Sequence, residues 1–253
     1  MRAIILAAGR GLRLLQPEDR QLPKCLLQFD GVTLLERHLR MLKSTGVDEV
    51  VLALGFRYEL IEAELDRLGW QPRPEIVLNM RFELGSVLTL HTAADAMTRG
   101  GDVLLMDADV LYDERIMEAL VAGSHSVNRL LIDRDFEDGE EPVKLCLRGG
   151  VPVELRKQLA AGSGYDAVGE SVGFFRFTHA AARRLAVLVA GYVESGRAQM
   201  PHEEAVRDLI IERTQPIEVA DVTGAPWIEI DYSQDVLRAA NEVLPQLQAL
   251  AVP

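Results

Sequence analysis

"RAIILAAGRGLRLLQPEDRQLPKCLL", residues 2–27, opens with an apolar run and then breaks into a loop rich in glycine and arginine. The run "AIILAA" at 3–8 has no polar alternation, which is typical of a strand buried on both faces in a parallel sheet. In such sheets ligands bind where the strands end, so the loop after this strand is the place to seek a binding site. Gly9 and Gly11 let backbone N–H groups approach an anion closely, and the loop therefore predicts a phosphate site.

Outward from this stretch, buried strand-like runs alternate with helix-like segments through the first half of the chain. Further strands are predicted at 49–55, 75–79 and 102–110, and helices at 34–46, 58–68, 86–100 and 113–123. This alternation predicts an α/β fold, with a single-domain, Rossmann-like and mostly parallel (mixed) sheet flanked by helices.

The second half of the chain has a less regular pattern. Strands are predicted at 129–133, 143–148, 151–155, 171–177, 217–220 and 227–230, and helices at 179–195, 202–213 and 233–244. Ser233 is the expected N-cap of the last helix. No repeat and no long linker marks a boundary, so we expect one domain over residues 1–253.

The 253 residues are 48% hydrophobic and carry a formal net charge of −12, the balance of an ordinary soluble globular protein. The acidic surplus repels phosphate backbones, so a nucleic-acid partner is not expected. The apolar runs are shorter than the roughly 20 residues that span a bilayer, and no secretory signal pattern is visible, so we expect no membrane partner and a cytoplasmic location. Cys25 and Cys146 are too far apart in sequence for a zinc motif.

Two common phosphate loops are excluded by the letters of the opening stretch. The string GxxxxGK[ST] occurs nowhere, and GxGxxG would require a glycine where Leu14 stands. A flexible glycine turn with solvated arginines remains the alternative to an anion site. The local charge favours an anion site, because residues 1–24 hold two acids against five cations, Arg2, Arg10, Arg13, Arg20 and Lys24.

The strings "LAAGRGLRL" and "PKCLL" together resemble the opening signature LAAGxGxR(L/M)…PKxL of the nucleotidyltransferases that activate phosphorylated substrates with an NTP. The matching residues are Leu6, Ala7, Ala8, Gly9, Gly11, Arg13, Pro23, Lys24 and Leu26. The resemblance implies a fold of the nucleotide-diphospho-sugar transferase type. It also implies nucleotide binding by Leu6, Ala7, Ala8, Gly9, Arg10 and Gly11, with Arg13 and Lys24 as catalytic cations. Such transfers depend chiefly on positioning and on cations that stabilise negative charge.

Carboxylates at two predicted strand ends are candidates for binding Mg²⁺, which an NTP substrate requires and which prefers oxygen ligands. In an extended strand Asp107 and Asp109 share one face, and so do Glu229 and Asp231. The family resemblance implies that Asp109 and Asp231 are the metal ligands and that Asp107 supports the nucleotide. The alternatives are a turn residue for Asp107 and a helix-capping acid for Asp231.

The resemblance extends through "NMRFELGS" (79–86), "GESVGFFRF" (169–177), "PHEEAVRDL" (201–209) and "WIEID" (227–231). These segments look most like the phosphocholine and 2-aminoethylphosphonate cytidylyltransferases, which implies CTP as donor. Asn79, Gly85 and Ser86 are then expected near the nucleotide, although Ser86 could equally cap the helix that it begins. The implied division is a nucleotide-binding part, residues 1–125, and an acceptor-binding part, residues 126–253.

The acceptor is predicted to be a small phosphonate or phosphate that carries an amine. A quaternary ammonium is usually held by aromatic rings, whereas the chain is only 6% aromatic and its candidates are Phe136, Tyr165, Phe174, Phe175, Tyr192 and Trp227. Acids crowd the same segments, at Glu140, Glu141, Asp166, Glu170, Glu203 and Glu204, which modestly favours a primary ammonium. We assign acceptor binding to Lys144, Glu170, Glu203 and Glu229, with a solvated strand lysine as the alternative for Lys144.

The expected reaction is in-line attack by the acceptor oxygen on the α-phosphorus of CTP, with release of pyrophosphate. Two enzymatic alternatives are a sugar-1-phosphate or an inositol-1-phosphate nucleotidyltransferase, and a noncatalytic NTP-binding regulatory subunit is the alternative of another class. The helix pair at 179–213 offers a surface for a homodimer. No metal-ligand spacing links the five histidines, so most are expected to be surface or packing residues: His38, His91, His125, His179 and His202.

Overall fold

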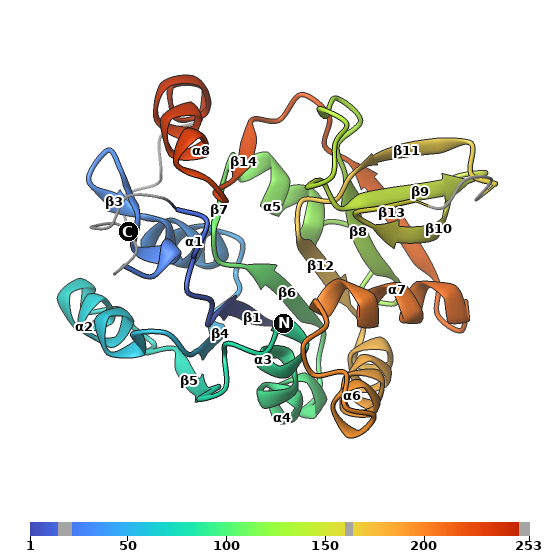
Figure 1. Cartoon of the computed structure of the whole chain (residues 1–253), viewed down its shortest axis with the longest axis horizontal. Helices are drawn as coiled ribbons and strands as arrows, with labels where there is room; N and C mark the ends of the chain where they lie inside the picture. Colours follow the sequence, from blue (N-terminus) through green and yellow to red (C-terminus); the bar gives the residue numbers. More distant parts are fainter. Residues whose placement is uncertain (15–21, 160–163, 248–253) are drawn as a thin grey trace.

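The computed structural model describes residues 1–14, 22–159 and 164–247. Its centre is a seven-stranded sheet in the order β13-β8-β12-β6-β1-β4-β5 (Figure 1). Only β12 runs antiparallel to its neighbours in this sheet, so the predicted mixed and mostly parallel α/β fold is confirmed. The strands are β1 (Arg2–Ala7), β4 (Glu49–Leu54), β5 (Glu75–Leu78), β6 (Val103–Asp107), β8 (Asn128–Ile132), β12 (Phe174–Phe177) and β13 (Ile217–Asp221).

Helices cover both faces of the sheet. Side chains of β1 alternate between two cores: Ile4 and Leu6 pack with one set of helices, and Ala3 and Ile5 pack with the other. The first set is α3 (Ser86–Thr92), α4 (Ala94–Thr98), α6 (His179–Glu194) and α7 (His202–Glu212). The second set is α1 (Leu34–Ser44), α2 (Tyr58–Leu68) and α5 (Glu114–Val121). An apolar run without alternation is therefore what this double burial requires.

A separate three-stranded antiparallel sheet extends the second half of the chain (Figure 1). It consists of β9 (Lys144–Arg148), β10 (Val151–Arg156) and β11 (Ala167–Glu170). The predicted hairpin turns at Gly149 and Gly150, whose φ angles of +56° and +79° favour glycine. The strand predicted at 171–177 begins only at Phe174, because the chain turns at Gly173 with a φ of +79°.

Two small antiparallel pairs complete the strands. One joins β2 (Gln28–Phe29) to β3 (Val32–Thr33), and the other joins β7 (Val110–Tyr112) to β14 (Trp227–Glu229). A short 3₁₀ helix, Lys24–Leu26, precedes β2. The β7–β14 pair connects residues far apart in sequence and brings Glu229 opposite Val110.

Two predicted helices differ from the structure. The segment 86–100 forms two helices, α3 and α4, that meet at Ala93. The last helix is capped at Tyr232, since the Asp235 carboxylate accepts the main-chain N–H of Tyr232 at 2.7 Å, and Ser233 is its first residue. This α8 (Ser233–Arg238) continues as a π-helix, Ala239–Val243, and a 3₁₀ turn, Leu244–Gln246. Within the three described ranges, no helix is both long and apolar enough to cross a bilayer.

Candidate active site

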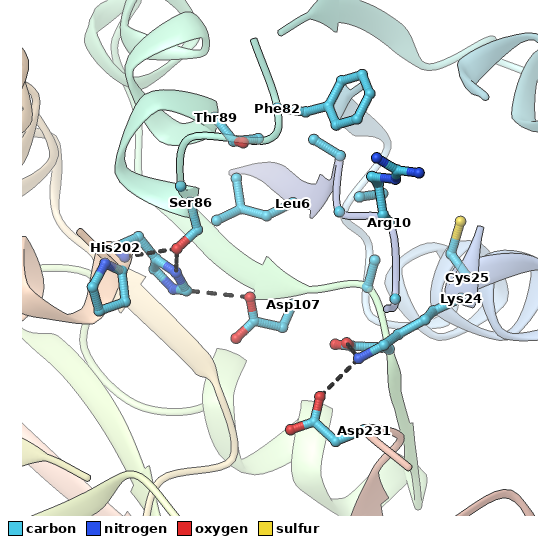
Figure 2. Close-up of a pocket in the computed structure, with 18 of the residues that line it drawn as sticks. Leu6, Arg10, Lys24, Cys25, Phe82, Ser86, Thr89, Asp107, His202 and Asp231 are labelled. Carbon is cyan, nitrogen blue, oxygen red and sulfur yellow. Dashed lines mark hydrogen bonds and ion pairs between the residues drawn. The ribbon is translucent and has the colours of Figure 1, made fainter. Parts of the chain in front are cut away.

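A cleft of about 650 Å³ opens where β1 and β6 end (Figure 2). Its size is in the usual range for small-molecule sites. Of the residues predicted from sequence to form the site, the cleft is lined by Leu6, Ala7, Ala8, Gly9, Arg10, Gly11, Arg13, Lys24, Gly85, Ser86, Asp107, Asp109, Glu203, Glu229 and Asp231.

The glycine loop lets the lysine that follows it lie along the cleft. Gly11 has a φ of +60°, and a Cβ added there would lie 3.1 Å from Cγ of Lys24. The Gly11 carbonyl accepts the N–H of Leu14 at 3.0 Å, which closes a tight turn. A larger residue at Gly11 would therefore strain the turn and displace the stem of Lys24.

The two predicted catalytic cations each contact carboxylates in the cleft. Nζ of Lys24 lies 2.8 Å from Oδ2 of Asp109 and 2.8 Å from Oδ1 of Asp231, which also accepts from Nη2 of Arg13 at 2.9 Å. Burial alone would lower the pKa of Lys24, but Asp109 and Asp231 together raise it above its usual value. Lys24 is therefore a fixed positive charge at the end of the first strand.

Three carboxylates meet beside Lys24. Oxygen atoms of Asp109, Glu229 and Asp231 all lie within 4.8 Å of one another. The β7–β14 pair produces this proximity, and the main-chain N–H of Ile230 donates to the carbonyl of Asp109 at 2.9 Å. The negative charges of Asp109 and Asp231 beside it raise the pKa of Glu229 well above its usual value. An all-carboxylate set of this kind fits a hard divalent cation such as Mg²⁺.

Asp107 and Asp109 both line the cleft but have different neighbours. The strand β6 ends at Asp107, and the chain bends at the next two residues. Asp109 contacts Lys24, whereas Oδ1 of Asp107 lies 3.9 Å from Nε2 of His202. Burial and the negative charges of Glu203 and Asp109 raise the pKa of Asp107 well above its usual value.

The alternative roles considered for Ser86 and Asp231 are wrong. Ser86 does not cap α3; its Oγ accepts the main-chain N–H of His202 at 2.8 Å. Asp231 does not cap α8, because Asp235 takes that role and also accepts the main-chain N–H of Asp231 at 3.0 Å.

His202 and Lys157 also line the cleft, and sequence reasoning missed both. His202 was expected to be a surface or packing residue, and it is 2% exposed at the start of α7 with its ring facing Asp107. Lys157 follows β10, and its Nζ lies 3.0 Å from Oε2 of Glu141. Lys157 lies in none of the segments that resemble the family, whereas His202 lies in one of them, "PHEEAVRDL".

Three residues predicted to form the site lie outside this cleft. Asn79 is buried and shapes the loop before α3, since its Nδ2 donates to Oγ1 of Thr89 at 3.0 Å and its Oδ1 accepts the N–H of Arg81 at 2.9 Å. Lys144 and Glu170 pair across β9 and β11. Arg20, one of the five cations in residues 1–24, falls outside the described residues.

Lys144 lines a neighbouring cavity of about 490 Å³. Its Nζ donates to the carbonyl oxygens of Gly139 and Lys157, at 2.5 and 2.9 Å. Lys157 lines this cavity as well as the main cleft, so the two spaces adjoin at one cation.

Glu170 predicts a pH-dependent contribution to stability. Burial and the carboxylate of Asp133 raise its pKa to about 7, above the roughly 4.3 of an unfolded chain. Its contribution is therefore fully present below about pH 4.3 and is lost as the pH rises through 7, by about 4 kcal/mol at most. Urea unfolding of wild type and Glu170→Gln at pH 5 and pH 8 tests this: the variant should gain relative stability at pH 8. An equal difference at both pH values would contradict it.

Comparison with known proteins places this geometry in a family. The CTP:phosphoglutamine cytidylyltransferase of Campylobacter jejuni is 22% identical over 262 residues, which cover 93% of this chain and 98% of that protein. The bifunctional IPC transferase and DIPP synthase of Rubrobacter xylanophilus is 29% identical over 257 residues and 96% of this chain. The chain spans about half the length of that second relative, 51%.

The fold is shared with solved structures. The inositol-1-phosphate CTP transferase from T. maritima superposes with a TM-score of 0.74 at 21% identity, covering 98% of each chain. The model of the MobA-like NTP transferase domain matches residues 3–172, a span that contains the glycine loop, Lys24 and Asp109. Since this match covers more than half of the chain, the protein belongs to the family of MobA-like NTP transferase domains.

Proposed function

We propose that this protein is a CTP-dependent cytidylyltransferase, which transfers CMP from CTP to a small phosphonate or phosphate acceptor and releases pyrophosphate. The observation that carries the proposal is the position of Lys24 between Asp109 and Asp231, directly beside the glycine loop. One cleft thus holds the cations that a triphosphate needs and the carboxylates that its metal needs. The names of the C. jejuni relative and of the T. maritima structure support CTP as the donor.

The proposed catalysis is electrostatic. Mg²⁺, held by Asp109, Glu229 and Asp231, would neutralise phosphate charge. Lys24 and Arg13 would then turn from these carboxylates to the phosphate oxygens and stabilise the charge that develops during attack on the α-phosphorus. The acceptor oxygen is already ionised at neutral pH, so no side chain is required as a general base.

The acceptor is proposed to lie beside Lys157. This cation lines both the cleft and the adjoining cavity, whose wall includes Asp138 and Glu140 together with Phe136 and Tyr165. An anionic head at Lys157 and an ammonium among these acids and rings would match a 2-aminoethylphosphonate or phosphocholine type of acceptor. On this proposal residues 126–253 bind the acceptor, although Glu229 and Asp231 return to complete the metal site.

Pyrophosphate release tests the proposal. CTP, UTP, GTP and dTTP would each be paired with 2-aminoethylphosphonate, phosphocholine, phosphoethanolamine, inositol 1-phosphate and several sugar 1-phosphates. We expect turnover with CTP and an amine-bearing acceptor. A preference for UTP, GTP or dTTP with a sugar 1-phosphate would overturn it. The absence of pyrophosphate release with every pair would favour a noncatalytic NTP-binding subunit.

Inositol 1-phosphate is the second candidate acceptor. It is favoured by the T. maritima structure, which matches this chain over 98% of its length. That acceptor has hydroxyls and no ammonium, so the same panel separates the two candidates.

Replacing Lys157 by methionine is expected to raise the KM for the acceptor by about tenfold or more, the usual effect of losing a charge-assisted hydrogen bond. The KM for CTP should change little, because Lys157 approaches the cleft from the side of the adjoining cavity. Steady-state kinetics with each substrate varied in turn measure both constants. Equal changes in the two KM values would contradict the assignment.

A further inference from the structure

One wall of the cleft carries a buried histidine with an unpartnered ring nitrogen. His202 is 2% exposed, and its Nε2 has no hydrogen-bond partner among the described residues. Figure 2 shows the ring between Ser86 and Asp107, where Oδ1 of Asp107 is 3.9 Å from Nε2, beyond hydrogen-bond distance. A buried polar atom without a partner is costly, which points to a ligand group that completes it.

The other ring nitrogen fixes the hydrogen-bonding character of Nε2. Nδ1 of His202 lies 3.1 Å from Oε2 of Glu203 and 3.2 Å from Oγ of Ser86. A carboxylate oxygen this close to Nδ1 favours the N–H form of that nitrogen over its lone pair, and Oγ of Ser86 then accepts the hydrogen. In the neutral ring Nε2 is then a bare acceptor.

The ring is held in place by packing between two distant segments. The main-chain N–H of Val87 donates to the carbonyl of Met200 at 3.1 Å, and a Cβ added at Gly85 would lie 2.6 Å from the main chain of Gln199. Phe175 packs edge-on against the ring, with centroids 6.3 Å apart. These contacts leave Nε2 aimed at the cleft.

The position of His202 along the cleft indicates which part of a ligand it would meet. Lys24 and Asp231 lie at one end of the view in Figure 2, and Ser86, Thr89 and His202 lie at the other. On the proposed function the triphosphate lies beside Lys24, so the nucleoside extends toward Ser86 and His202. Nε2 accepts hydrogen bonds there, so this wall calls for a donor.

We propose that Nε2 of His202 accepts a hydrogen bond from a donor group of the bound nucleoside, either the amino group of cytosine or the 2′-hydroxyl of ribose. This inference rests on the proposed function. It makes His202 a residue that selects the nucleotide, whereas Lys24 and Arg13 act on phosphates that all NTPs share.

The test compares the binding of CTP, UTP and 2′-deoxy-CTP, each with Mg²⁺ at pH 8, to wild type, His202→Asn and His202→Gln by calorimetry. UTP lacks the amino group and 2′-deoxy-CTP lacks the hydroxyl. Asparagine keeps an N–H near the place of Nδ1 but has no acceptor near Nε2, whereas the longer glutamine amide reaches the place of Nε2. The two variants are thus a matched pair, and thermal unfolding shows whether each is folded.

We expect wild type to bind one analogue about tenfold more weakly than CTP, a loss typical of one hydrogen bond. In His202→Asn the ratio of the Kd for that analogue to the Kd for CTP should fall toward one, because CTP binding weakens. His202→Gln should recover part of the preference for CTP. Loss with UTP assigns the amino group, and loss with 2′-deoxy-CTP assigns the hydroxyl.

The role of His202 would be overturned if the ratio of analogue Kd to CTP Kd were the same in wild type and in whichever variant folds. It would also be overturned if wild type bound all three nucleotides equally. The proposed function fails on a different result, the absence of pyrophosphate release by wild type with every substrate pair. If wild type turns over CTP but the Kd ratios do not change in the variants, only the inference about His202 is contradicted.

Discussion

Replacing Lys24 by methionine is expected to lower kcat for CMP transfer by a factor of about 10² to 10³, the usual loss when one preorganised donor to developing negative charge is removed. The side chain is 14% exposed and its charge is fixed by two carboxylates, so water cannot substitute for it well. Methionine keeps most of the stem that passes Gly11. Steady-state pyrophosphate release with the best substrate pair measures the effect.

Lys43→Met is the matched control for Lys24→Met. Lys43 lies on α1 and faces the ring of Trp70 at 5.2 Å, away from the cleft lining. Its replacement removes the same charge and should leave kcat within a few-fold of wild type. A Lys24→Met enzyme with near-normal turnover would show that this lysine does not stabilise the reacting phosphate.

The second large effect is expected at Asp109. Changing it to asparagine keeps the shape of the side chain but removes one charge from the proposed metal site, and turnover at saturating CTP should fall about a thousandfold, since a bound metal supplies several kcal/mol. The residual rate should require a higher Mg²⁺ concentration. Titration of turnover with Mg²⁺, and of Mn²⁺ binding to the protein without nucleotide, measures both effects.

Asp95→Asn provides the control for Asp109→Asn, because Asp95 is exposed on α4 outside the cleft. Asp231→Asn should resemble Asp109→Asn, since the two carboxylates share Lys24. If turnover depended on Mg²⁺ in the same way in Asp109→Asn, Asp231→Asn and wild type, the proposal that this cluster binds the metal would be contradicted.

Local sequence sufficed for the elements whose apolar residues follow a clear pattern of burial. The run at 3–8 predicted β1 because both of its faces are buried, and the apolar spacing after 179 predicted α6, now His179–Glu194. The short strands β2, β3, β7 and β11 were missed, because none of them contains a long run of apolar residues or a sustained alternation of apolar and polar ones. The break at Ala93 likewise has no glycine or proline to signal it.

The candidate site was only partly visible in the sequence. The glycine loop and Lys24 lie within one short stretch of the sequence, so both were found from a single signature. Asp109 and Asp231 were selected as separate strand-end acids, whereas their contact with Glu229 depends on the β7–β14 pair. For Lys144 and Glu170, which face each other outside the cleft, the predicted role in acceptor binding stays a prediction.

By itself the sequence determined an α/β sheet and an anion-binding loop, because hydrophobic periodicity and glycine content act over a few neighbouring residues. Only the tertiary structure decided that α7 brings His202 against Ser86 and Asp107, and that Lys157 separates two adjoining cavities. The physical reason is distance along the chain: 116 residues separate Ser86 from His202. Their contact is set by how whole helices pack on the sheet, which no local pattern of side chains encodes.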